Sequence, residues 1–124
     1  MGNLEVTSFG GIYRNRNVLL TGHTGFKGSW LALWLQTLGA KVTGLALAPG
    51  TNPSHWDMLG LKIDDKRVDI RDCEEVANAV QCSSPEIVFH MAAQSLVRCS
   101  YANPLETWST NVIGTASVLE ACRK

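Results

Sequence analysis

The sequence predicts an α/β fold: a partial, doubly wound parallel sheet of about four strands in the order 3-2-1-4. Short apolar segments alternate along the chain with longer segments of helical periodicity. Gly22, Gly25 and Gly28 lie between the first apolar segment and the first helical one. Right-handed crossovers between parallel strands make 3-2-1-4 the natural order and place a crevice at the carboxyl end of the first strand.

The first half of the pattern contains two strands that flank one helix. We expect a buried strand over residues 17–20 and a helix over about residues 27–38. Gly39 stands where the C-terminal cap of that helix belongs. A second strand over residues 41–47 is followed by a loop over residues 48–61, which contains two prolines.

The second half repeats the alternation of strand and helix. Residues 67–70 are expected to form a short third strand. Asp72 and Glu75 have the D-x-x-E spacing of a capping box, which predicts a helix that ends near residue 81. Residues 86–91 predict the fourth strand, and Asn103 is expected to cap a last helix that has proline at its first position.

Composition limits the class of protein. A chain of 124 residues with 45% hydrophobic residues suits one domain, with residues 1–16 as an N-terminal extension and residues 17–124 as the folded unit. Lys plus Arg (11) equals Asp plus Glu (11), so charge gives no sign of a nucleic-acid partner. No apolar run has membrane-spanning length and the first residues lack a signal-peptide pattern, so we expect a cytoplasmic protein.

The remaining chemistry-bearing side chains are expected to have structural roles. The four cysteines show no CxxC and no metal-ligand spacing, so they are interpreted as reduced thiols that mostly pack, and no metal site is expected. His23 and His90 are interpreted as ordinary turn and strand residues. Trp30, Trp34 and Trp108 occupy helical positions and are expected in the core.

The three spaced glycines indicate a binding function. Glycine permits positive φ and close approach of a ligand, while the free amides of a helix start attract phosphate. The spacing G-x-x-G-x-x-G after Thr21 is a variant of the dinucleotide fingerprint of Rossmann-type folds. A nucleoside-triphosphate loop needs Gly-Lys-Ser/Thr, whereas Lys27, Gly28 and Ser29 stand here in another order. The alternative is a glycine turn that only lets the helix pack on the strand.

The same residues resemble a known family. The segment TGHTGFKG is similar to the cofactor loop of extended short-chain dehydrogenases/reductases, and HTGFKGSW resembles CDP-glucose 4,6-dehydratases in particular. The segments ALAPGTNPS, DIRD, VFHMAAQSLVR and TNVIGTASVLEA extend the resemblance over residues 12–123. Most sugar-nucleotide relatives have an aliphatic residue and histidine where this chain has Lys27 and Trp30.

This resemblance implies a cofactor site for NAD, with NADP not excluded. The implied cofactor-binding residues are Gly22, Thr24, Gly25, Phe26, Lys27, Gly28, Asp69, Ile70, Met91, Ala92, Ala93, Gln94 and Thr110. The backbone amides of residues 26–27 would lie over the pyrophosphate, and residues 91–94 would run along the cofactor. Asp69 would accept a hydrogen bond from the adenine amino group while Ile70 packs on the ring. Ser95 would face the sugar substrate.

For several of these residues, an ordinary structural or surface role remains as an alternative. Asp69 is also consistent with a solvated acid at a strand end, and Lys27 with a solvated lysine at a helix start. By the resemblance, Asn111 holds the last helix and a proton-relay water; a purely structural hydrogen bond is the alternative.

The position that usually selects NAD departs from the pattern. An acid about twenty residues past the glycines normally binds the ribose hydroxyls. Leu47 or Ala48 stands there, and no arginine lies near to accept a 2′-phosphate. Neutral side chains of Thr51, Asn52 and Ser54 remain as ribose partners, so the choice of NAD rests on the family.

The chain lacks the catalytic pair of the resembled enzymes. Their dehydration of CDP-glucose to CDP-4-keto-6-deoxyglucose needs a tyrosine base with a lysine four residues on. Asn17 follows Tyr13 and Leu105 follows Tyr101 at that spacing, so no catalytic residue is assigned. We expect the cofactor-binding N-terminal portion of a nucleotide-sugar 4,6-dehydratase, with the catalytic part missing from this chain.

Other functions remain open. A nucleotide-sugar epimerase or reductase of the same superfamily, a non-catalytic NAD-binding module, or a structural remnant that binds no cofactor would share the glycine loop. The expected partners are a nucleotide-sugar substrate in the full-length enzyme and a second copy of the chain. A homodimer or larger species follows from an unpaired sheet edge and an apolar last helix.

Overall fold

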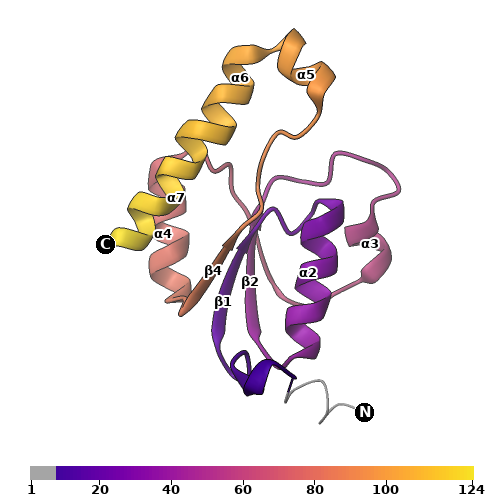
Figure 1. The fold of residues 1–124 in the computed structure, drawn as a ribbon, viewed down its shortest axis with the longest axis vertical. Coiled ribbons are helices and arrows are strands. Elements are labelled where there is room, and N and C mark those ends of the chain that lie inside the picture. The colour runs from indigo at the N-terminus through magenta and orange to yellow at the C-terminus, as the bar shows by residue number, and fades with distance from the viewer. Residues whose placement is uncertain (1–7) are drawn as a thin grey trace.

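A four-stranded parallel sheet in the order β3-β2-β1-β4 forms the centre of the computed structural model, which describes residues 8–124 (Figure 1). The strands are β1 Asn17–Thr21, β2 Lys41–Ala46, β3 Asp64–Arg67 and β4 Ile87–His90. Leu19 of β1 pairs with Thr43 of β2 on one side and with Val88 of β4 on the other. The expected fold class and strand order are therefore confirmed.

Helices cover both faces of this sheet. The helices are η1 Ser8–Gly11, α2 Phe26–Thr37, α3 His55–Leu59, α4 Cys73–Ser83, α5 Val97–Ala102, α6 Pro104–Trp108, η2 Ser109–Ile113 and α7 Gly114–Arg123. Figure 1 shows α2 and α3 on one side of the sheet, and α4 packed beside α7 on the other. No helix of residues 8–124 combines the length and the apolar character needed to cross a bilayer.

Successive side chains of β1 point to opposite faces of the sheet, so each face has its own part of the hydrophobic core. Val18 and Leu20 pack with Leu35 of α2, whereas Leu19 packs with Val76 of α4 and its neighbours on the other face. All of these side chains are at most 1% exposed. A strand buried on both faces has a continuous apolar sequence, which explains why β1 was predictable.

The third strand is not where the sequence predicted it. Residues 67–70 were expected, but β3 spans Asp64–Arg67 and its side chains are mostly exposed. An edge strand of this kind is held by backbone pairing, so no apolar pattern marks it. Val68 still donates its N–H to the Ala46 carbonyl at 3.1 Å, and Ile70 is only 4% exposed because it packs beneath α7 after leaving the sheet.

The long loop and the last helix also contain structure that the sequence analysis did not resolve. α3 interrupts the loop of residues 48–61; Ser54 caps it by accepting the Asp57 N–H at 3.1 Å. The helix α5 was not predicted at all. The last helix begins at Pro104 as expected, but a π-helical segment, η2, separates α6 from α7.

Two expectations about packing are wrong. Trp30, Trp34 and Trp108 are 51%, 52% and 66% exposed rather than core residues. Because α2 is apolar around much of its circumference, helical position alone did not identify its buried side. All four cysteines are exposed free thiols rather than packing residues, and the described residues contain no metal-binding cluster.

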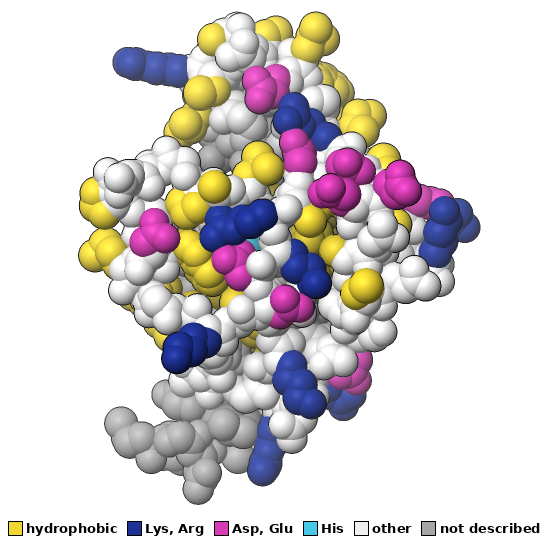
Figure 2. Space-filling view, turned by 180° about the vertical axis from the view of Figure 1, so that it is seen from behind, with side chains coloured by type: hydrophobic (Ala, Val, Ile, Leu, Met, Phe, Trp, Pro, Cys, Tyr) yellow, Lys and Arg dark blue, Asp and Glu magenta, His cyan; other side chains and the backbone are white. Residues whose placement is uncertain are grey.

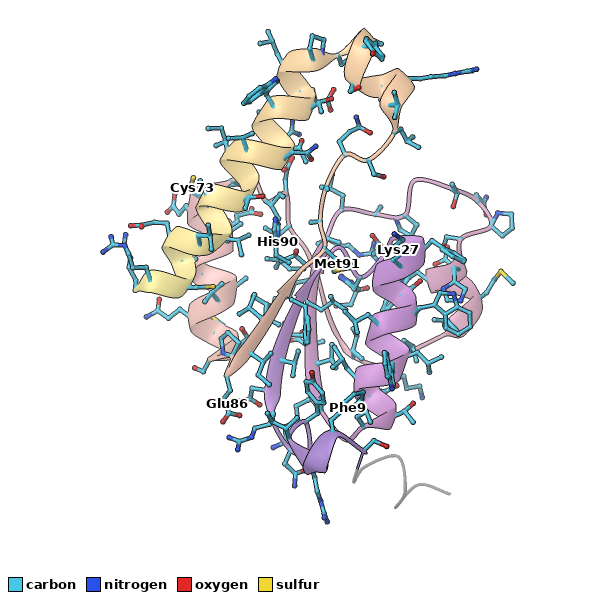
Figure 3. The ribbon with its side chains drawn as sticks, in the orientation of Figure 1. Phe9, Lys27, Cys73, Glu86, His90 and Met91 are labelled. Atoms are coloured by element: carbon cyan, nitrogen blue, oxygen red, sulfur yellow. The ribbon has the colours of Figure 1, made fainter. Side chains whose placement is uncertain are left out.

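Residues 8–16 of the expected extension lie against the amino end of the sheet; residues 1–7 are outside the described part. The ring of Tyr13 lies 6.3 Å from that of Phe89, and the ring of Phe9 lies 5.6 Å from that of Trp34. Arg16 forms an ion pair with Glu86 at 2.7 Å. Figure 3 shows Phe9 and Glu86 at this end, opposite to Lys27 and Met91.

Candidate functional site

The glycine loop joins β1 to α2 at the carboxyl end of the sheet. Gly22 has φ +79°, and a Cβ there would lie 2.7 Å from the Ala92 nitrogen. A Cβ on Gly28 would collide with the Gly22 carbonyl group. Both glycines are therefore required by the packing of the chain itself.

Gly25 is different, because nothing within the chain requires it. Its φ of −76° suits any residue, and a Cβ would lie 3.4 Å from the Gly22 oxygen, which is ordinary contact. Gly25 is also the N-cap of α2 and provides no side-chain hydrogen bond to the first-turn amides. The helix start is thus left open to an acceptor from outside the chain.

A cleft of about 590 Å³ opens over this helix start. Its lining includes every residue assigned to cofactor or substrate by the resemblance: Gly22, Thr24, Gly25, Phe26, Lys27, Gly28, Asp69, Ile70, Met91, Ala92, Ala93, Gln94, Ser95 and Thr110. Five further residues line it that the sequence analysis did not assign: Ala46, Leu47, Val68, Arg71 and Glu106. The ends of three parallel strands converge here, which brings together segments far apart in the sequence.

Hydrogen bonds hold the segment after β4 along one wall of the cleft. The Thr21 hydroxyl oxygen accepts the N–H groups of Met91 and Ala92 at 3.0 and 3.1 Å, and lies 2.7 Å from Nδ1 of His90. His90 Nε2 lies 2.9 Å from the Thr115 hydroxyl of α7. Figure 3 shows His90 and Met91 at the end of β4, and Met91 lines the cleft together with Lys27 of α2.

Asn111 fixes the backbone further along the same wall. Its Oδ1 accepts the Gln94 N–H at 2.7 Å, and its Nδ2 donates to the Gln94 carbonyl at 3.0 Å. This is the structural hydrogen bond that the sequence analysis left as an alternative. Asn111 lies within η2, and π-helical segments of this kind occur frequently at functional sites.

An ion pair forms the wall beyond β3. Arg71 donates to both carboxylate oxygens of Asp69, with its Nη2 at 2.6 Å from Oδ2. The hydrogen bond from the Arg71 side chain lowers the pKa of Asp69, which therefore stays ionised. A charged carboxylate is a hydrogen-bond acceptor, and Ile70 beside it adds an apolar surface to the cleft.

An arginine side chain reaches the end of β2, contrary to the expectation that none lies near, although it is not among the residues that line the cleft. Arg67, the last residue of β3, donates its Nη1 to the Leu47 carbonyl at 3.3 Å. The hydroxyl of Thr24 donates to the same carbonyl at 2.8 Å. Arg67 is distant from Leu47 in the sequence, so only the pairing of β2 with β3 brings it here.

The cleft walls contain no tyrosine among the described residues, and His23 does not line the cleft either. Tyr13 lies at the opposite end of the sheet, and Tyr101 is 85% exposed on α5. His23 is fully buried, with Nε2 at 2.7 Å from Asp65 Oδ1. The lining of the cleft, within residues 8–124, therefore contains no tyrosine–lysine pair.

Comparisons with known proteins agree with this geometry. CDP-glucose 4,6-dehydratase of Salmonella typhimurium is 50% identical over 114 residues, which are 90% of this chain and 32% of the relative. CDP-paratose 2-epimerase of Salmonella typhi is 32% identical over 111 residues, which are 86% of this chain and 32% of the relative. The chain thus spans about a third of the length of the curated relatives it matches.

Solved structures show the same architecture. The NAD complex of UDP-glucose 4-epimerase from Thermus thermophilus superposes with a TM-score of 0.74 at 34% identity, over 86% of this chain and 33% of that one. An epimerase from Methanothermobacter thermautotrophicus superposes with a TM-score of 0.80 at 29% identity, over 99% of this chain and 35% of the epimerase. The profile of the GDP-mannose 4,6 dehydratase family matches residues 19–124. The strand order, the glycine loop and this match together show that the chain belongs to the GDP-mannose 4,6 dehydratase family.

Proposed function

We propose that this chain is the part of a nucleotide-sugar 4,6-dehydratase that binds the nicotinamide dinucleotide, and that CDP-glucose is the sugar nucleotide of the full-length enzyme. The observation that carries the proposal is Gly25. It lines the cleft at an uncapped helix start, yet neither its backbone conformation nor its packing requires glycine. Space kept free of a side chain at such a point suits a pyrophosphate.

The remaining lining residues fit the rest of such a ligand. The carboxylate of Asp69 accepts from the adenine amino group, and Ile70 offers an apolar surface to the ring. The small side chains of Ala92 and Ala93 in the lining would leave room for the nicotinamide half; Thr110 and Ser95 line the same cleft, where Ser95 would contact the sugar. When bound, NAD supplies a hydride acceptor; the residues of this chain bind and orient it.

Two kinds of relative support the choice of cofactor and reaction. Two structural neighbours, both UDP-glucose 4-epimerases, are complexes with NAD. The relative that is 50% identical is a CDP-glucose 4,6-dehydratase. A second candidate, a nucleotide-sugar epimerase, is favoured by those structural neighbours; offering CDP-glucose and UDP-glucose to the full-length enzyme separates the two.

We infer a reducing compartment such as the cytoplasm as well. Four exposed cysteines remain free thiols in the structure, a pattern that persists where disulfides do not form. Figure 2 shows basic and acidic side chains interspersed, and ion pairs such as Arg71–Asp69 join the two signs. A face without a field of one sign, on a chain with 11 basic and 11 acidic residues, does not favour a nucleic-acid partner.

Gly25→Val tests the proposed function. A valine side chain would fill the space at the helix start, so NAD affinity measured by isothermal titration should fall by at least about tenfold, the loss expected from one blocked phosphate site. Gly50→Val is the matched control, because a Cβ on Gly50 meets nothing within 4 Å and Gly50 lies outside the cleft lining. Equal NAD affinity in Gly25→Val and the native chain, with circular dichroism unchanged, would contradict the proposal.

A further inference from the structure

We infer that His90 is a positioning residue for the dinucleotide. As a neutral imidazole with its proton on Nε2, it joins β1 to the last helix through a chain of hydrogen bonds that has a single direction. The inference rests on the proposed function, because it takes the dinucleotide to lie along residues 91–94. It gives His90, which does not line the cleft itself, a role beyond that of an ordinary strand residue.

His90 ends β4 with its side chain on the face of the sheet that α7 covers. Val88, two residues earlier, packs into the part of the core that includes α4 and α7, and side chains two apart on a strand share a face. Figure 3 shows His90 between the strand ends and α7. Nδ1 lies 2.7 Å from the hydroxyl oxygen of Thr21, and Nε2 lies 2.9 Å from that of Thr115. The ring thus bridges β1 and α7.

Thr115 determines which ring nitrogen carries the proton. Its hydroxyl donates to the Asn111 carbonyl, one helical turn earlier, at 2.6 Å. A hydroxyl has one proton to donate, so toward His90 the Thr115 oxygen is an acceptor. Nε2 therefore carries the proton, and in a neutral imidazole Nδ1 is then an acceptor.

Thr21 completes the chain on the other side of the ring. Its hydroxyl donates to Nδ1 of His90, and its oxygen accepts the N–H groups of Met91 and Ala92 at 3.0 and 3.1 Å. The Met91 N–H also donates to the Thr21 backbone carbonyl at 3.1 Å, whereas the hydroxyl is the acceptor for Ala92. Thr21 has no exposed surface, so its hydroxyl uses its one proton and both lone pairs within the chain.

A second proton on the ring is incompatible with this arrangement. The new Nδ1–H would point at an oxygen whose two lone pairs already accept N–H groups, and the buried Thr21 hydroxyl would lose its own acceptor. The protonated ring therefore displaces the hydroxyl that holds Ala92, a residue of the cleft lining. The position of Ala92 thus depends on a neutral His90.

The surroundings of the ring favour this neutral form. β1 and α7 present hydroxyl groups to it, and no acidic or basic side chain of residues 8–124 contributes to its titration. Burial lowers the pKa of His90 below its ordinary value of 6.5. NAD affinity should therefore be constant above pH 6.5 and fall as the pH drops through the lowered pKa, because only then does the free chain gain the proton.

The dependence of NAD affinity on pH tests the inference. Isothermal titration into the full chain between about pH 8 and pH 5.5 should give a constant affinity above pH 6.5 and about fivefold weaker binding at the acid end, the value of one lost hydrogen bond. Circular dichroism at each pH checks that the chain is folded. An NMR spectrum of the imidazole nitrogens at neutral pH should show His90 with its proton on Nε2.

Variants at the histidines assign the effect. The amide of His90→Gln can accept from Thr21 and donate to Thr115 but does not titrate, so this variant should bind NAD equally well at neutral and acid pH. His55→Gln is the matched control, because His55 bonds Ser29 of α2 and does not line the cleft. This control should keep the native fall in affinity.

A pair of substitutions at Thr115 tests the chain of hydrogen bonds without changing the ring. Thr115→Val keeps the shape of the side chain but removes the acceptor for Nε2–H, whereas Thr115→Ser keeps the hydroxyl. NAD affinity at neutral pH should fall about fivefold in Thr115→Val and stay near native in Thr115→Ser. Thr115 does not line the cleft, so such a loss acts through His90 and the wall beside it.

The results that would overturn the inference are distinguishable from failure of the proposed function. If NAD binds equally well from pH 8 to pH 5.5, if His90→Gln keeps the fall, or if the His90 proton is on Nδ1, the inference fails and the proposed function stands. If NAD does not bind to the folded native chain at neutral pH, the proposed function fails together with it.

Discussion

His23 is a histidine with no exposed surface, within the glycine loop between β1 and α2. Its ring meets the edge of Trp56 with centroids 4.8 Å apart, and a Cβ on Gly44 would collide with it. Nε2 bonds Asp65, while Nδ1 is buried without a partner among the described residues. Burial lowers the pKa of His23 below its ordinary value of 6.5, against the opposing effect of the hydrogen bond that the ring makes to the Asp65 carboxylate.

The same residue gives a prediction for stability against pH. Burial also lowers the pKa of His90, so both histidines bind protons more readily in the unfolded chain. Stability should then be constant above pH 7 and fall as the pH drops below about 6.5, where the unfolded state takes up protons first. Thermal unfolding followed by circular dichroism between pH 8 and 5 measures this slope.

A double variant assigns that slope to the two histidines. His23→Gln combined with His90→Gln removes both titrating groups, so its melting temperature should change less between pH 7 and 5 than that of the native chain. Comparing slopes rather than absolute melting temperatures allows for the destabilisation that the substitutions cause. A native melting temperature that stays flat from pH 8 to 5 would contradict the expectation.

At the scale of elements, η2 links the last helix to the cleft. A π-helical segment changes the rotation of the side chains along a helix, and Asn111 lies within it. Its amide satisfies both backbone groups of Gln94, in the strip that forms one wall of the cleft. The position of this wall therefore depends on a helix that is distant from the glycine loop in the sequence.

Asn111→Leu tests this dependence. Loss of both hydrogen bonds leaves two backbone groups of Gln94 without partners, which should cost roughly 2 kcal/mol of unfolding free energy in urea. We also expect weaker NAD binding, because the wall formed by residues 91–95 loses its anchor at Gln94, while Thr21 still holds Met91 and Ala92. Asn111→Asp keeps the acceptor for the Gln94 N–H and should lose less, while Val112→Ala, a neighbour that is 47% exposed, is the control. Native stability in Asn111→Leu would show that the strip is held by other contacts.

At the scale of the whole molecule, large apolar side chains are exposed on several elements. β4 is an edge strand of the sheet, so one side of its backbone is unpaired within residues 8–124. Leu105, Trp108 and Leu119 are 84%, 66% and 66% exposed along the α6–α7 helix. Trp30 and Trp34 border a second, apolar groove of about 540 Å³ on α2.

We expect this chain to self-associate through such surfaces. Multi-angle light scattering at micromolar concentration should show a dimer or a larger species. Trp108→Lys combined with Leu119→Lys should shift the population toward monomer, because a charge cannot be buried cheaply in an apolar contact. Met58→Lys is the control, since Met58 is 74% exposed on α3. A native monomer with a cooperative thermal transition would contradict this expectation.

Much of this molecule was predictable from its sequence, because its central elements have strong local signals. β1 is a continuous apolar strand, the glycines stand at the turn into α2, and Asp72 caps α4 by accepting the Glu75 N–H at 3.0 Å. Every residue assigned to the site by resemblance lines one cleft in the structure. Segments at strand ends meet wherever parallel strands are adjacent, so strand order brought these residues together, except for Thr110, which lies on η2.

Tertiary structure alone decided the features whose sequence signal is weak or absent. β3 consists of charged residues and is held by its neighbour's backbone, so its position, and the arrival of Arg67 at Leu47, depend on strand pairing. The exposure of Trp30 and Trp34 depends on which side of an apolar helix faces the sheet. The chain by itself therefore determined the fold class and the glycine-loop site, since these follow from local patterns and strand order. The partner of each polar group at that site was set by contacts between residues far apart in the sequence.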